Sequence, residues 1–259
     1  MNILIKRGDH LVLRSHKGNK SMHSKLSNYV NDIRRFKCKG DTLLVTYDYQ
    51  IHLGNSIDNV ALTLKNNQGI LQQIVTELTG LDTVDNKYTI ITPDGNLSGT
   101  STEVVIITSP ASELDFLREE SKQHKIYIDK CIPDILLLNK LSSNKSKLIF
   151  STYGNILRIS IFEGNFIKGF LEIDSELYNY NEFRKELERV LMYLKIHSKN
   201  TARLAPIVVA TGTEMNQFKP YIQTTIFEVS KFNKRKTNPM IKKFSTNLLH
   251  SLATANGRR

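Results

Sequence analysis

The chain has 259 residues, of which 40% are hydrophobic and 24% charged, a composition that excludes a disordered protein and provides for a folded core. Its two cysteines, Cys38 and Cys131, lack CxxC spacing and offer neither a zinc site nor a disulfide framework, which favours a reducing compartment. The N-terminus carries no signal peptide, and no window approaches the roughly 20 apolar residues of a membrane span. We therefore expect a soluble, cytoplasmic protein.

The net charge of +11 is concentrated at the C-terminus. Residues 230–259 contain eight basic side chains and no acidic one, whereas the other 229 residues carry 28 basic and 25 acidic side chains. Such a tail can bind nucleic acid, lie on an anionic membrane surface, or simply be solvated. The near-neutral body argues against a nucleic-acid-binding protein as a whole.

Apolar residues in the first half of the chain recur with the periods of strands and helices. Lys6-Arg7-Gly8-Asp9 separates two apolar segments and predicts an N-terminal hairpin. Residues 93–100 (PDGNLSGT) predict a loop. In chain order, the predicted elements are strands at 1–5 and 10–14, a helix at 27–36, a strand at 42–49, a helix at 68–81 and a strand at 88–92.

The second half begins with an apolar segment at residues 103–108 (EVVIIT), typical of a buried strand. Ser109 and Pro110 then predict the N-cap and first residue of a helix. The predicted elements continue with that helix to residue 124, a strand at 125–129, a helix at 133–141, a meander at 148–173, a helix at 181–197, a strand at 205–210, a helix at 215–222 and a final strand at 226–232.

Strands that alternate with helices in both halves indicate an α/β architecture. A meander followed by further helices and strands in each of two lobes is the pattern of the actin-like, or ribonuclease H-like duplicated, fold with mixed sheets. We expect lobe I at residues 1–143, with a variable insertion near 50–100, and lobe II at 144–229. Residues 230–259 would form a basic C-terminal tail or juxtamembrane segment.

Four segments, in this order, resemble the actin-like cytoplasmic proteins of type IV pilus assembly (PilM) and the cytoplasmic part of type II secretion protein L. Their order carries the resemblance more than any single motif. The third segment corresponds to the adenosine-side turn of actin-like ATPases, and the fourth resembles a docking segment of PilN-type partners. They are VVIITSPASELDFLREESKQHKIYIDKCIPDILLLNKL, KLIFSTYGNILRISIFEGNFIKGFLEI, APIVVATGTEMNQFKPYI and FSTNLLHSLA.

The resemblance implies three turns that would hold a nucleotide, at Gly8, Gly154 and Gly212. An actin-like ATPase needs an acidic residue at each phosphate hairpin to position magnesium and the attacking water. The first hairpin has Lys6-Arg7 at this position, and the second has Ser151-Thr152-Tyr153. We therefore expect no catalytic residue, no metal and no cofactor, with ATP binding without hydrolysis as the remaining alternative.

The resemblance also implies surfaces for partners. Asn247, Leu248 and Leu249 match the docking segment, although His250 follows where the family has proline. A helix packed on the chain's own core explains these leucines equally well. In the predicted helix at 181–197, Glu182 and Arg189 are candidate contacts for a charged partner, although a solvated face explains them too.

Within the basic tail, Lys234, Arg235 and Lys236 are candidates to face the membrane. No two of the seven histidines are spaced four residues apart, which argues against a metal site, and no GxSxG, HExxH or P-loop motif occurs.

These patterns favour a non-catalytic scaffold in the inner-membrane assembly platform of a type IV pilus or a type II secretion system. It would be cytoplasmic, associated with the bacterial inner membrane, and would link a motor ATPase to membrane subunits. Two alternatives remain: a nucleotide-binding actin-like regulator of the same machinery, and a nucleic-acid binder acting through the tail. We do not expect the second, because the tail has only Phe232 and Phe244 for base stacking. The sequence leaves open which of the two machines is served.

Overall fold

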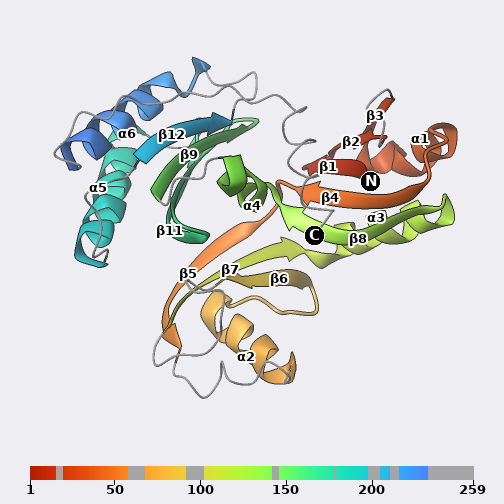
Figure 1. Ribbon diagram of the computed structural model, residues 1–259, viewed down its shortest axis with the longest axis horizontal. Helices are drawn as coiled ribbons and strands as arrows, with labels where there is room; N and C mark the ends of the chain where they lie inside the picture. The colour runs from red at the N-terminus through yellow and green to blue at the C-terminus, as the bar shows by residue number, and fades with distance from the viewer. Residues whose placement is uncertain are drawn as a thin grey trace. The chain divides into compact units, whose positions relative to one another are not determined.

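The computed structural model describes residues 1–15, 20–57, 68–91, 102–141, 146–177, 179–197, 205–210 and 216–232 (Figure 1). The described chain divides into two compact units. The first contains Met1–Leu137, and the second begins at Leu138. Beyond Phe232, the predicted basic tail lies outside the described residues, as do residues 58–67 and 92–101 of the predicted insertion.

The main sheet of the first unit combines antiparallel and parallel pairing. An antiparallel meander continues into strands that run parallel to its first strand, as an α/β layer requires. The strand order is β3 (Ser21–Lys25), β2 (His10–Arg14), β1 (Asn2–Arg7), β4 (Gly40–Thr46) and β8 (Ile126–Pro133).

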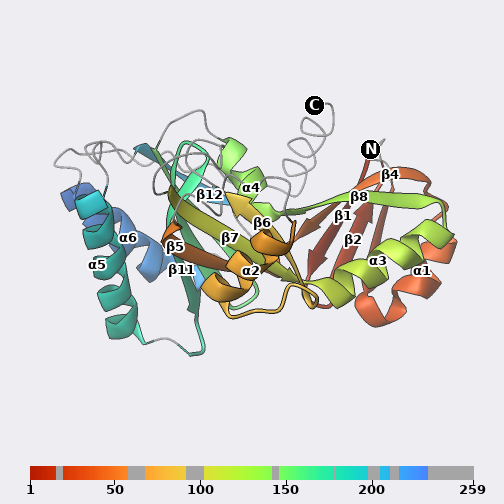
Figure 2. The same ribbon diagram turned by 90° about the horizontal axis from the view of Figure 1, so that it is seen from below.

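Two helices, α1 (Tyr29–Arg35) and α3 (Ala111–Gln123), cover the same face of this sheet (Figure 2). A one-turn 3-10 helix, η1 (Leu26–Asn28), precedes α1. The layer is held by one apolar cluster, because each helix places its apolar stripe on leucines of the sheet. Its buried members include Leu4, Leu11, Leu13, Leu44, Tyr29, Ile33, Leu114, Leu117, Ile126 and Ile128.

The first unit also has a three-stranded antiparallel sheet with the order β5 (Gln50–Ile57), β7 (Thr102–Pro110) and β6 (Asn86–Ile91). Helix α2 (Gln68–Thr79) buries Ile74 and Val75. Val104–Ile107 in β7 are all buried, which confirms the strand predicted from the apolar segment EVVIIT.

The second unit contains a four-stranded sheet with the order β11 (Phe166–Asp174), β10 (Ile156–Glu163), β9 (Ser146–Tyr153) and β12 (Ala205–Ala210). The predicted meander β9–β10–β11 is antiparallel, and β12, also predicted as a strand, runs parallel to β9. Helices α5 (Tyr180–His197) and α6 (Lys219–Phe232) pack on it through one cluster. That cluster includes Leu148, Phe150, Leu157, Ile159, Phe183, Leu187, Phe218, Ile222 and Val229.

One predicted strand is wrong. Residues 226–232 are the end of helix α6, not a strand, and the helix predicted from residue 215 begins at Lys219. Ile222, Ile226 and Val229 are spaced by four and three residues, so a helix brings all three onto the core although their side chains are β-branched.

Two smaller differences concern local signals. Pro110 is the N-cap of α3, not its first residue, and no side chain caps that end of the helix. Strands β3 and β5 were not predicted, because Ser21–Lys25 and Gln50–Ile57 contain too few apolar residues to show a strand period.

Between β8 and β9, the helix predicted at 133–141 is a short α4 (Asp134–Leu138) followed by the 3-10 helix η2 (Asn139–Leu141).

A buried tyrosine gives this core a measurable pH dependence. The Tyr29 hydroxyl lies 2.7 Å from Ser121 Oγ, and both side chains are fully buried. Burial raises the pKa of Tyr29 to about 12, although the hydrogen bond with Ser121 lowers it. In the unfolded chain the phenol ionises near pH 10. The unfolded state therefore loses this proton first, and stability is lost as the pH rises from about 10 to about 12.

We expect Tyr29→Phe to weaken this alkaline loss, because the variant has no phenol to ionise. The missing hydrogen bond should lower the free energy of unfolding by about 1 kcal/mol at pH 8. Urea denaturation at pH 8, 10 and 11 measures both effects. An equally steep decline above pH 10 in the wild type and the variant would show that Tyr29 is not responsible.

Candidate functional site

The turn between β1 and β2 contains Gly8, the first of the three glycines predicted to hold a nucleotide. Gly8 has a positive φ of 52°, which glycine adopts without strain. Its backbone N–H donates to the protein itself, with both Asp48 carboxylate oxygens 2.9 Å from the nitrogen. Asp48 comes shortly after the end of β4. In a nucleotide site a backbone N–H of this kind would donate to a phosphate oxygen. Here the Gly8 N–H donates to the Asp48 carboxylate of the same chain.

Lys6 provides a cation that pairs with the same Asp48 carboxylate. Its Nζ lies 2.6 Å from Asp48 Oδ2 and 2.5 Å from Glu113 Oε2, and the side chain is only 2% exposed. Strand β1 presents Lys6, the segment after β4 presents Asp48, and the first turn of α3 presents Glu113. One ammonium group therefore joins three elements of the first unit.

The environment of Lys6 keeps it charged. Burial by itself lowers the pKa of Lys6, but the hydrogen bonds and charges of Asp48 and Glu113 raise it, and the net result is a raised pKa. The group is an ammonium ion at neutral pH and donates to both carboxylates. The ammonium group lies between the Asp48 and Glu113 carboxylates, and two neighbouring carboxylates favour a cation between them.

Arg7, the second cation of the predicted loop, is bound elsewhere. Its Nη2 lies 2.9 Å from the Tyr47 hydroxyl, and its guanidinium carbon lies 4.2 Å from the centre of the Tyr47 ring. Lys6 and Arg7 thus both have partners within the first unit, and their correspondence to the acidic residue of an ATPase hairpin stays a prediction. Asp48 and Glu113 were missed, although each follows a recognisable signal, the end of an apolar strand and the start of a helix.

The turn between β9 and β10 in the second unit contains Gly154, the second of these glycines. Gly154 has a φ of 54°, and a side chain at this position would meet no atom within 4 Å. The guanidinium group of Arg158 lies 5.7 Å from the centre of the Tyr153 ring and pairs with Glu172 at 3.1 Å. The Gly154 carbonyl accepts a hydrogen bond of 3.4 Å from Gln217. At the end of β9, Ser151 and Thr152 are buried.

The remaining predicted residues divide into two groups. One group lies outside the described residues: Gly212, Asn247, Leu248, Leu249, Lys234, Arg235 and Lys236. Glu182 and Arg189 are both exposed on α5, within the second unit. Arg189 pairs with Glu186 at 2.6 Å within the helix, and the Glu182 backbone N–H bonds to Asn179. The structure does not place these two side chains in a common site.

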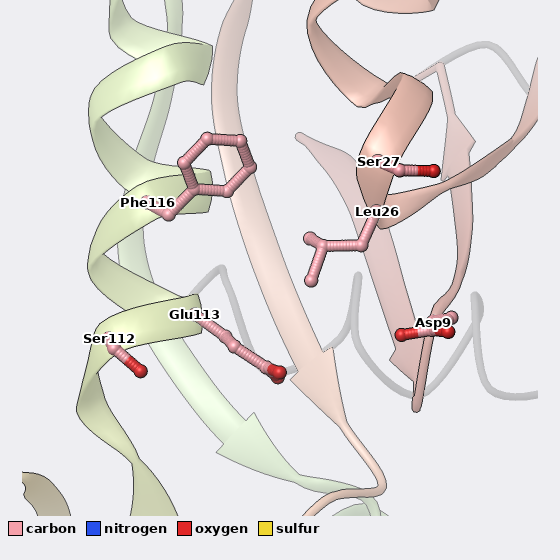
Figure 3. Close-up of a pocket in the computed structure, with 6 residues that line it drawn as sticks. All are labelled: Asp9, Leu26, Ser27, Ser112, Glu113 and Phe116. Carbon is pink, nitrogen blue, oxygen red and sulfur yellow. The ribbon is translucent and has the colours of Figure 1, made fainter.

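A pocket of about 500 Å³ adjoins the ion pairs of Lys6 (Figure 3). It opens between the start of α3, the 3-10 helix η1 and the turn after β1. Six residues line it: Asp9, Leu26, Ser27, Ser112, Glu113 and Phe116. Sequence reasoning did not predict this pocket, because its residues come from three separate parts of the chain.

The described part of the chain gives no support for a metal site, a reactive cysteine or a membrane-spanning helix. There, no group of three or more His, Cys, Asp or Glu side chains could hold a metal ion. Burial raises the pKa of the Cys131 thiol to about 12, so the reactive thiolate is disfavoured, as expected for a small buried side chain. No helix in the described ranges has both the length and the apolar character to cross a bilayer.

No protein-family model matches the sequence, and a search of curated proteins finds no match. Solved structures do match. The cytoplasmic domain of EpsL, an inner-membrane component of the type II secretion system of Vibrio cholerae, is 10% identical with a TM-score of 0.55, over 98% of this chain and 95% of that chain. A Bacteroides thetaiotaomicron protein with an actin-like ATPase fold and unknown function is 11% identical with a TM-score of 0.50, over 98% and 95%. A type IV pilus PilM–PilN complex is 8% identical with a TM-score of 0.49, over 97% and 84%.

The chain therefore has the actin-like α/β fold with mixed sheets, which confirms the predicted fold class. At this level of identity the similarity establishes the fold alone.

The ion pairs of Lys6 lead to a stability prediction. We expect Lys6→Met to lower the free energy of unfolding by about 2–3 kcal/mol, because Asp48 and Glu113 lose their shared cation. Asp48 should turn toward solvent, so the Gly8 amide should also exchange its hydrogen faster. Urea denaturation and hydrogen exchange measure the two effects.

Lys122→Met is the matched control. Lys122 is exposed on α3 and should change stability by no more than about 0.5 kcal/mol. A Lys6→Met variant as stable as this control would contradict a stabilising role for the ion pairs.

Proposed function

We propose that this protein is a non-catalytic cytoplasmic scaffold of an inner-membrane assembly platform, in a type II secretion system or a type IV pilus. It would link a motor ATPase to membrane subunits. The fold supports the proposal, because the EpsL cytoplasmic domain, which has the same fold over nearly its whole length, belongs to an inner-membrane component of a type II secretion system. The sequence resemblance to PilM and to protein L points in the same direction.

The observation that carries the non-catalytic part of the proposal is the occupied first hairpin. The Gly8 amide binds Asp48, and Lys6 lies between Asp48 and Glu113. Phosphoryl transfer in an actin-like site needs backbone donors for phosphate and carboxylates for magnesium. Here the donor and both carboxylates already have partners, and a Mg²⁺-nucleotide would have to displace a buried ammonium ion.

The contacts of the scaffold are part of the proposal. The exposed face of α5 with Glu182 and Arg189 is one candidate for the motor ATPase. Asn247, Leu248 and Leu249 are candidates for docking to a membrane subunit, and Lys234, Arg235 and Lys236 for an anionic membrane surface.

A pull-down of the cognate motor ATPase tests the scaffold role. We expect the wild-type protein to retain the ATPase, and a Glu182→Arg, Arg189→Glu double variant, which keeps the net charge, to retain less. A Glu119→Arg, Arg35→Glu double variant alters the first unit with the same charge balance and should retain it fully. Failure to retain either the motor ATPase or any inner-membrane subunit would overturn the proposal.

A nucleotide-binding regulator is the second candidate. It is favoured by one observation: both hairpin glycines, Gly8 and Gly154, keep the positive φ of a phosphate turn. Isothermal titration with Mg²⁺ and ATP separates the two. We expect no binding tighter than about 100 μM, which corresponds to roughly 5.5 kcal/mol. Tighter binding would favour the regulator over a scaffold without nucleotide.

A further inference from the structure

The pocket beside the β1–β2 turn has two apolar side chains facing one another and two carboxylates at one end (Figure 3). Phe116 on α3 and Leu26 on η1 point toward each other across the space. Phe116 is 38% exposed, so a phenyl ring stands partly in water at this surface. The carboxylates of Asp9 and Glu113 lie beside these apolar groups.

The charges around this pocket do not balance. Lys6 is shared between Asp48 and Glu113, and the Asp9 side chain forms no ion pair with a described residue. Among the described residues, no cation other than Lys6 pairs with a carboxylate that lines the pocket. Of the two carboxylates that line the pocket, Glu113 shares the Lys6 ammonium ion with Asp48, and Asp9 has no cationic partner among the described residues, so the pocket is acidic beside an exposed aromatic ring.

We propose that this pocket binds an arginine side chain of a partner polypeptide, together with an apolar side chain next to it. A guanidinium group can stack on the exposed ring of Phe116 while its N–H groups donate to the Asp9 carboxylate. A compact, strongly hydrated cation would gain little from the apolar walls, whereas a guanidinium group is weakly hydrated and planar.

The size of the pocket supports a polypeptide as the occupant. About 500 Å³ lies within the range of sites that enclose drug-sized ligands, so there is room beyond a single guanidinium group. Leu26 offers an apolar contact for the neighbouring side chain, and the hydroxyls of Ser27 and Ser112 can bond to a peptide backbone. The choice of a protein ligand rests on the scaffold role proposed above.

Two blocked dipeptides test the inference: acetyl-arginyl-leucine amide and acetyl-citrullyl-leucine amide, which has nearly the same shape without the charge. NMR titration of the full chain follows the amides of Asp9 and Glu113 and the methyl groups of Leu26. We expect saturable shifts with the arginine peptide and a Kd near 1 mM. The citrulline peptide should bind at least tenfold more weakly.

Three variants locate the binding. Asp9→Asn and Phe116→Ala should each weaken binding of the arginine peptide about tenfold, and both change exposed side chains, so the fold should persist, as circular dichroism will show. Glu119→Gln removes the same charge as Asp9→Asn from an exposed position on α3 that does not line the pocket. It should bind the peptide as tightly as the wild type.

Three results would overturn the pocket: equal binding of the two peptides, an Asp9→Asn variant that binds like the wild type, or the absence of saturable shifts. Failure of the scaffold role gives a different result. Peptide binding without retention of the motor ATPase or a membrane subunit would support the arginine-binding pocket and overturn the scaffold role. Retention of these proteins without peptide binding would support the scaffold role and overturn the arginine-binding pocket.

Discussion

The buried ammonium group of Lys6 joins three parts of the first unit through ion pairs. Lys6 of β1 reaches Asp48 beyond β4 and Glu113 at the start of α3. A buried charge of this kind is strongly unfavourable without partners, so these ion pairs favour the packing in which the three elements meet. The same carboxylate that neutralises Lys6 also fixes the turn through the Gly8 amide. Stability and the shape of the hairpin thus depend on one set of contacts.

This arrangement explains how the chain keeps an actin-like fold while its first hairpin carries no free phosphate-binding donor at Gly8. A phosphate turn needs an anion to satisfy its backbone donor, and a carboxylate pair needs a cation. In an ATPase the bound Mg²⁺-nucleotide supplies both. Here the Gly8 amide bonds to Asp48, and Lys6 lies between Asp48 and Glu113, so the donor and both carboxylates have partners within the first unit. The acidic, aromatic pocket next to Glu113 adjoins these contacts.

Much of the fold followed from the sequence. The N-terminal hairpin, the buried strand at Val104–Ile107, the meander of the second unit and helix α5 were all predictable, because their apolar residues recur with one clear period. Polar strands such as Ser21–Lys25 gave no such signal. The end of α6 was misassigned because β-branched residues favour a strand locally, whereas Ile222, Ile226 and Val229 contact the core of the second unit at helical spacing.

By itself the sequence determined that the chain folds as an α/β protein, and that Lys6 and Arg7 directly precede the glycine of a predicted N-terminal hairpin. Only the tertiary structure decided what those cations do. Lys6 is bound by Asp48 and Glu113, which are 42 and 107 residues away, and Arg7 is bound by Tyr47. The physical reason is that ion pairs depend on distance in space, and residues from separate strands and helices approach only when the sheet and its covering helices have packed.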